Sequence, residues 1–139
     1  MRVLLDSSFI LSSVQLGVDA MRMLEDSLCG KLEPFLLSET LGELKTISAR
    51  RGKKGREAQL ALKIVERYPV FSDTERATTV DEAIVKAAAQ LGCIVATNDM
   101  RLKRKLRASG VAVAFLHRNK RMEVEGWAGP REKSASVTR

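Results

Sequence analysis

The sequence predicts an α/β fold, a three-layer sandwich in which helices cover both faces of a mainly parallel five-stranded sheet. Short apolar runs alternate with segments of helical periodicity in the order β-α-β-α-α-β-α-β-α-β. Such alternation is typical of parallel sheets, whose strands are joined by right-handed helical crossovers. The chain has 139 residues, of which 45% are hydrophobic. This is enough for one compact domain without a disulfide framework.

The first half of the chain supplies three of the predicted strands and three helices. Residues 3–5, 34–37 and 70–71 are short apolar runs next to polar or turn-forming residues, which indicates buried strands. Residues 18–28 are expected to form a helix, because apolar side chains recur there at three- and four-residue spacing. Ser38 is expected to cap the next helix.

A basic segment precedes the third predicted helix. Residues 50–56 combine five bases with two glycines and are expected to form a loop. Residues 57–67 then show helical periodicity, with Leu60, Ala61 and Ile64 expected to point into the core.

The second half has clearer boundaries. Thr79 and Glu82 fit a capping box at the start of a helix that ends at Gly92. Residues 93–96 follow as a buried strand, and residues 111–116 provide the last one.

A further helix between those strands is expected to be capped by Asn98 or Asp99 and to end at Gly110. We expect residues 1–127 to form the domain and residues 128–139 to be a flexible polar tail.

The composition excludes several classes of protein. One histidine and two cysteines, Cys29 and Cys93, cannot build a zinc cluster, and we expect both thiols to be buried. No apolar stretch is long enough to cross a membrane, and the first residues do not form a secretory signal. We therefore expect a cytoplasmic protein.

Charge is unevenly distributed along the chain. The net charge of +7 suggests a polyanionic partner such as nucleic acid. Residues 1–49 are net acidic, as are residues 68–99, whereas residues 50–67 and 100–139 are strongly basic. Metal-assisted chemistry on a phosphate backbone requires both kinds of segment.

Four acids fall at related places in the predicted fold. Asp6 ends the first strand, Asp99 follows the fourth, Asp81 opens a helix, and Glu43 lies in the second turn of another. Ligands of parallel sheets bind beyond the carboxyl ends of the strands, where these acids could share one crevice. Taken singly, each acid also fits an ordinary role as a strand end, a helix cap or a solvated side chain.

Clustered carboxylates point to a particular chemistry. They stay ionised together only when cations lie between them, and oxygen ligands without histidine favour Mg²⁺ or Mn²⁺. Such ions activate water and stabilise the leaving oxygen when a phosphodiester is cleaved.

Four short motifs resemble those of PIN-domain ribonucleases, in the order of that family. They are VLLDSS at residues 3–8, LGEL at 41–44, VDEAI at 80–84 and VATND at 95–99. The resemblance covers about residues 1–117 and implies a metal-dependent ribonuclease. It implies these metal ligands: Asp6, Glu43, Asp81 and Asp99. Ser8 and Asn98 would support them.

The sequence departs from the family at one position. Some PIN proteins carry a further aspartate two residues after the last motif, where this chain has Arg101. Residues 15–19 and the basic segment resemble archaeal members near the ribosomal-RNA-processing branch more than VapC toxins. The resemblance also implies a homodimer, for which Met21, Met23 and Leu24 are a candidate surface.

The two basic segments are candidates for RNA binding, because bases of this kind hold phosphates without reading sequence. The residues concerned are Arg50, Arg51, Lys53, Lys54, Arg56, Arg101, Lys103, Arg104 and Lys105. Two alternatives to an active ribonuclease stay open. One is a catalytically silent RNA-binding or ribosome-assembly factor, and the other is a VapC-type toxin with an antitoxin partner.

Overall fold

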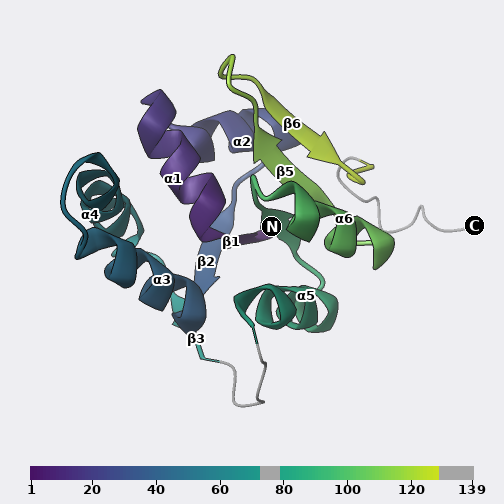
Figure 1. Cartoon of the computed structure of the whole chain (residues 1–139). Coiled ribbons are helices and arrows are strands. Elements are labelled where there is room, and N and C mark those ends of the chain that lie inside the picture. Colours follow the sequence, from purple (N-terminus) through teal and green to yellow (C-terminus); the bar gives the residue numbers. More distant parts are fainter. Residues whose placement is uncertain (73–78, 129–139) are drawn as a thin grey trace, which may run out of the picture.

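The computed structural model describes residues 1–72 and 79–128 and has the expected three layers (Figure 1). One sheet runs in the order β3-β2-β1-β4-β5-β6. Its strands are β1 (Arg2–Leu5), β2 (Glu33–Leu37), β3 (Val70–Phe71), β4 (Ile94–Ala96), β5 (Val113–Leu116) and β6 (Met122–Glu125). The helices are α1 (Ser7–Leu16), α2 (Ala20–Leu28), α3 (Ser38–Ser48), α4 (Lys53–Val65), α5 (Val80–Leu91) and α6 (Met100–Ala108).

The sheet has six strands, so the prediction of five was wrong. The first five strands in the chain pair in parallel, and β6 adds an antiparallel edge beside β5. The extra strand is half-buried along its whole length and includes two glutamates. A four-residue run of this kind shows little apolar pattern in the sequence, because it forms a strand by pairing with β5 rather than by being buried.

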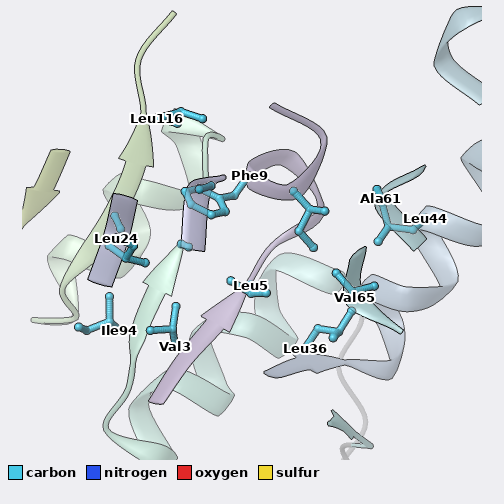
Figure 2. Packing of buried hydrophobic residues seen from close by; sticks show 14 of the residues in the cluster. Val3, Leu5, Phe9, Leu24, Leu36, Leu44, Ala61, Val65, Ile94 and Leu116 are labelled. Atoms are coloured by element: carbon cyan, nitrogen blue, oxygen red, sulfur yellow. The ribbon is translucent and has the colours of Figure 1, made fainter. Parts of the chain in front are cut away.

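Alternate residues of each strand face opposite layers. Val3 and Leu5 pack with α1, α2 and α4, whereas Leu4 packs with α5 and α6. Figure 2 shows the first of these two cores, where Phe9 and Leu24 lie over the sheet. The two-residue period of the strands thus places one helical layer on each face.

The capping predictions of the second half are confirmed at both ends of α5 and at the start of α6. Thr79 Oγ1 accepts a hydrogen bond from the Glu82 backbone N–H at 3.1 Å. Gly92 ends α5 with a φ of 63°, and Asp99 is the N-cap of α6. Ser38, by contrast, is the first residue of α3 rather than its cap.

Helix α1 was not predicted, although it places half of the site. It begins directly after Asp6 and buries Phe9, Ile10 and Ser13. Its five polar side chains among ten residues mask the apolar face. The helix is therefore stabilised by packing over the sheet rather than by a regular amphipathic pattern.

The basic segment and the face of α4 also differ from expectation. Lys53 begins α4, so the second half of the predicted loop is helical. Ala61 is buried as expected, but Leu60 is 51% exposed and Ile64 is 39% exposed. Small residues form the buried face of α4, because α3 and α1 pack closely against it.

Three smaller expectations near α2 are corrected. The helix begins at Ala20 rather than at residue 18. Leu24 is fully buried, so it cannot contribute to a partner surface. Cys93 is buried, whereas Cys29 is exposed because it lies beyond the end of α2 with a φ of 55°.

No helix in the described ranges has the length and apolar character needed to span a bilayer.

Candidate active site

The carboxyl ends of β1 and β4 bring two of the predicted acids together. These strands are neighbours in register, with Leu5 opposite Ala96. The Asp6 backbone N–H extends the ladder by donating to the Ala96 carbonyl at 2.9 Å. Asp6 and the loop that carries Asp99 therefore leave the sheet side by side.

Asp6 is held by two hydroxyl donors. Ser8 Oγ lies 2.6 Å and Thr97 Oγ1 lies 2.7 Å from the same carboxylate oxygen, Oδ2. The Asp6 residue is 5% exposed, and Thr97 is fully buried. Both hydroxyls orient the carboxylate, and its Oδ1 makes no hydrogen bond to any described residue.

Asp99 is fixed by the backbone around it. Its N–H donates to Thr97 Oγ1 at 3.1 Å, so one threonine contacts both acids. Its Oδ1 accepts from the N–H groups of Arg101 and Leu102 at 2.9 and 3.3 Å. Only Oδ1 is used in capping α6, and Oδ2 makes no hydrogen bond to a described residue.

Asn98 was predicted to support the ligands, and the structure shows how it positions the loop. Its side-chain Nδ2 donates to the Leu116 carbonyl at 2.7 Å, and its Oδ1 accepts from the Leu116 N–H at 2.9 Å. Its own backbone N–H donates to Ser8 Oγ at 2.9 Å. The amide thus ties the loop to the end of β5.

Glu43 approaches from α3. Ser7 Oγ donates to its Oε1 at 2.9 Å. Burial raises the pKa of Glu43; the Ser7 hydrogen bond opposes this rise, and the charges of Asp6, Asp81 and Asp99 add to it. Glu43 is therefore electrostatically coupled to all three other predicted acids.

Asp81 approaches from α5, which touches α3. Its pKa is raised first by burial and then by the charges of Asp99 and Asp6, while Lys105 and Arg101 lower it. The acid makes no hydrogen bond to a described residue. Two bases of α6 thus lie close enough to the acids to influence their ionisation.

The four acidic side chains influence one another's ionisation but do not form a preformed metal site. Within residues 1–72 and 79–128, no three His, Cys, Asp or Glu side chains are spaced to share an ion. Mg²⁺ usually takes one or two carboxylates, keeps several waters and completes its shell with substrate phosphates. The oxygen donors of the four acids fit an ion bound in this open way.

The predicted RNA-binding bases fall into two groups with different surroundings. Arg50, Arg51, Lys53, Lys54 and Arg56 are all exposed. On α6, Arg101, Arg104 and Lys105 are exposed, whereas Lys103 is half-buried. Lys103 Nζ lies 3.0 Å from Glu125 and 4.3 Å from the centre of the Phe115 ring. Lys103 therefore anchors β6.

Comparison with known proteins identifies the family. A family model described as a PIN like domain matches residues 3–120. The chain belongs to the PIN domain family. Ribonuclease VapC9 of Archaeoglobus fulgidus is 40% identical over 54% of this chain. The rRNA-processing protein FCF1 of Saccharomyces cerevisiae is 34% identical over 76% of it. Ribonuclease VapC4 of Methanocaldococcus jannaschii is 30% identical over 90% of it.

This chain spans different shares of the lengths of its relatives. It spans about half of VapC9 and of yeast FCF1, at 53% and 54% of their lengths, but 97% of VapC4. A solved structure of the PIN domain endonuclease Utp24 matches with a TM-score of 0.76 and 27% identity, covering 94% of this chain and 96% of that one. PIN nucleases generally use divalent metal ions.

Two functional side chains were not assigned from the sequence. Thr97 contacts both Asp6 and Asp99, and Ser7 holds Glu43. Both lie inside motifs that point to the family. Ser7 directly follows Asp6 and Thr97 lies two residues before Asp99, which was the available signal, but the direction of a side chain in a loop depends on the fold around it.

Proposed function

We propose that this PIN domain is a metal-dependent endoribonuclease, with Mg²⁺ or Mn²⁺ as the cofactor. The observation that carries the proposal is the convergence of four acids from separate elements. Asp6 follows β1, Asp99 follows β4, Glu43 lies on α3 and Asp81 on α5. The pKa of each of the last two is raised first by burial and then by the charges of Asp6 and Asp99, and the charge of Asp81 also raises that of Glu43. Such mutual repulsion favours the binding of a cation.

The residues of the site would have two roles, binding the ion and orienting the carboxylates that bind it. Asp6 and Asp99 would hold the ion through Oδ1 and Oδ2 respectively, because their other oxygens are committed to hydrogen bonds. Glu43 and Asp81 would complete the shell directly or through water. A bound Mg²⁺ or Mn²⁺ supplies activated water and charge stabilisation at the scissile phosphate. Ser8 and Thr97 keep the Asp6 carboxylate oriented throughout.

Bases beside the acids would hold the substrate. Arg101 and Lys105 lie near enough to Asp81 to lower its pKa, so they also reach a phosphate bound there. Such contacts place an RNA backbone without reading its sequence. Arg104 and the exposed bases of residues 50–56 would extend the same positive surface.

The test is cleavage of a structured RNA in the presence of Mn²⁺, with the wild type compared with Asp6→Asn. We expect the variant to lose more than about 100-fold in rate, because substitutions even behind metal ligands cost about 10- to 100-fold. Equal cleavage by the two proteins would show that another site, or a contaminant, is responsible. Unchanged thermal melting serves as the folding control.

Ribosomal RNA is the substrate class we favour. The support is the match to FCF1 over 76% of this chain and the fold similarity to Utp24. A ribosome-assembly partner, a cytoplasmic location and a homodimer belong to the same proposal. In a cell that lacks this protein, failure of the wild type to restore rRNA processing would contradict it.

Specific observations favour two alternatives. The match over 97% of VapC4 favours a VapC-type toxin, which would bind an antitoxin encoded beside it. The open spacing of the acids favours a silent RNA-binding factor. Complementation by Asp99→Asn separates the silent factor from the enzyme, since only a silent factor would tolerate that change.

A further inference from the structure

The exposed face of α1 leads away from the acids. Ser8 contacts Asp6, and Ser12 and Gln15 follow at four and seven residues along the helix. This spacing places all three on one side of α1. At 1.5 Å per residue, Gln15 lies roughly 10 Å along the axis from Ser8. The face therefore connects the site to the opposite end of the helix.

A hollow of about 630 Å³ lies between this face and the end of β5. Its lining contains hydroxyl, amide and guanidinium groups but no carboxylate. The residues are Ser8, Ser12, Gln15, Leu16, Asn98, Leu116 and Arg118. A polar, positively charged hollow without acids is suited to an anionic chain rather than to a cation.

A second hollow shares one lining residue, Gln15, with the first. It has a volume of about 200 Å³ and lies where α1 meets α3 and α4. Its residues are Leu11, Gln15, Ile47, Arg50, Lys54 and Glu57. Gln15 lines both hollows, and its Nε2 donates to Glu57 Oε1 at 3.2 Å. Figure 1 shows α1 between α4 and β5, as this shared side chain requires.

The backbone that carries the bases of the second hollow is closely packed. Gly55 is buried, and a Cβ at this position would collide with the Arg50 carbonyl. Gly52 has a φ of 87°, and its carbonyl accepts the Arg56 N–H at 3.2 Å. This close approach fixes the turn between α3 and α4. Arg50 and Lys54 are therefore presented from a rigid support.

We propose that these two hollows, which we name the α1 track, bind a single RNA strand adjoining the scissile phosphate. The inference rests on the proposed function and names the path of its substrate. Arg118 would contact phosphates near the acids, and Arg50 and Lys54 would contact them further away. In the described part of the chain, none of these three bases forms an ion pair.

The chemistry of the track favours RNA in one strand. Ser12 offers its hydroxyl and Gln15 its amide oxygen to sugar hydroxyls or base edges, which a single strand exposes, since Gln15 Nε2 already donates to Glu57. No aromatic side chain lines either hollow, so stacking contributes little and phosphate contacts dominate the affinity. Two small hollows joined over one side chain fit a strand better than a duplex.

The experiment compares oligonucleotides of different lengths. Fluorescent oligouridines of three and ten nucleotides are titrated in Mn²⁺ against Asp6→Asn, which prevents cleavage, and against the same protein carrying Arg50→Glu and Lys54→Glu. We expect the ten-nucleotide affinity to fall more than about tenfold and its logarithmic salt slope to fall by about 1.4, for two phosphate contacts. The three-nucleotide affinity should stay unchanged.

A control removes the effect of net charge. Lys31→Glu with Lys63→Glu makes the same charge change at exposed positions that line neither hollow. We expect this pair to retain most of the ten-nucleotide affinity. Equal losses in both double variants would overturn the track. If Arg50→Glu with Lys54→Glu lowers the melting temperature, the milder Gln substitutions at both positions repeat the test.

Crosslinking provides an independent readout. Ten-nucleotide RNA carrying 4-thiouridine should crosslink to peptides of α1 and of residues 50–56. Crosslinks confined to the hollow beside Asp81 and Lys105 would overturn the proposal. So would tighter binding of a ten-residue polyglutamate, which would assign the track to an acidic peptide.

The two proposals can fail separately. If Asp6→Asn keeps full cleavage but the length-dependent loss occurs, only the catalytic assignment is wrong. If Asp6→Asn abolishes cleavage but the track variants bind both oligonucleotides like the control, only the path is wrong.

Discussion

The four acids form two pairs that differ in how firmly they are held. We call Asp6 and Asp99 the sheet half and Glu43 and Asp81 the helix half. Asp6 and Asp99 leave adjacent strands and accept four hydrogen bonds from hydroxyl and backbone donors. Glu43 and Asp81 lie on α3 and α5, and from residues 1–72 and 79–128 they accept one hydrogen bond between them, from Ser7. Burial raises the pKa of both. The sheet half is organised before any ligand binds, whereas the helix half carries charge that the folded chain disfavours.

This difference indicates what each half contributes. Donors aimed at Asp6 and Asp99 lower the cost of keeping those carboxylates in place. Glu43 and Asp81 have few such donors, so a cation is the partner that would relieve their burial and mutual repulsion. We infer that the sheet half sets the position of the ion and the helix half strengthens its binding.

The largest expected effect comes from removing a charge of the sheet half without disturbing its geometry. Asp99→Asn keeps a good N-cap for α6, because Asn caps helices as well as Asp. We expect the rate of RNA cleavage to fall more than about 100-fold with little change in melting temperature. Retained activity would show that the sheet half does not position the ion.

The next effect concerns a positioning residue. Thr97→Val keeps the shape but removes the donor to Asp6 and the acceptor of the Asp99 N–H. We expect a loss of about 10- to 100-fold in Mn²⁺ affinity and about 1–3 kcal/mol in the free energy of unfolding. Calorimetric Mn²⁺ titration and chemical denaturation measure the two.

A matched control is available for Thr97. Thr40 is equally buried, but its Oγ1 has no hydrogen-bond partner among the described residues. Thr40→Val should therefore be neutral or stabilising and leave Mn²⁺ affinity unchanged. If the two variants behave alike, the Thr97 hydrogen bonds do not organise the site.

The helix half should make stability depend on pH and on metal. Because the pKa values of Glu43 and Asp81 are raised on folding, the folded protein binds protons more tightly than the unfolded one. Without metal, the free energy of unfolding should fall as pH rises above the ordinary values of 4.5 for Glu and 3.8 for Asp. Saturating Mn²⁺ should reverse this trend, since ion binding requires the charged forms.

Substitution checks that explanation. Asp81→Asn and Glu43→Gln should each raise the melting temperature in EDTA at pH 7 while weakening Mn²⁺ binding. Thermal melts from pH 4 to 8, with and without Mn²⁺, measure both effects. A variant that is destabilised in EDTA would contradict the view that these charges cost stability in the free protein.

The smallest effects distinguish two lysines of α6. Lys105→Ala should reduce the salt slope of RNA binding by about 0.7, as one lost phosphate contact would. Lys103→Ala should instead cost about 0.5–1 kcal/mol in stability, because it removes the contacts to Glu125 and Phe115. Filter binding and denaturation separate the two, and equal RNA binding losses would assign Lys103 to the RNA surface as well.

Some structural features depend on a few neighbouring residues in the sequence, whereas others depend on packing between distant parts of the chain. The capping box at Thr79 and the N-cap of α6 depend on a few neighbouring residues; the first was predicted, and the second was narrowed to Asn98 or Asp99, of which Asp99 is the cap. Helix α1 and β6 depend on packing against the sheet, and both were missed. The buried face of α4 was misassigned at Leu60 for the same reason, because its partners decide which stripe is covered.

The sequence by itself determined the α/β class and the order of the five parallel strands along the chain, and it predicted the four acids, three of them at element ends and Glu43 within a helix. These follow from local periodicity, capping chemistry and the rule that parallel strands present one common edge. Tertiary structure alone decided that Thr97 joins Ser8 in holding Asp6, which carboxylate oxygens stay available, and how the charges of Glu43 and Asp81 respond to burial. Those properties depend on contacts between residues far apart in the chain, such as Asp6 and Thr97, and on the exclusion of water around them.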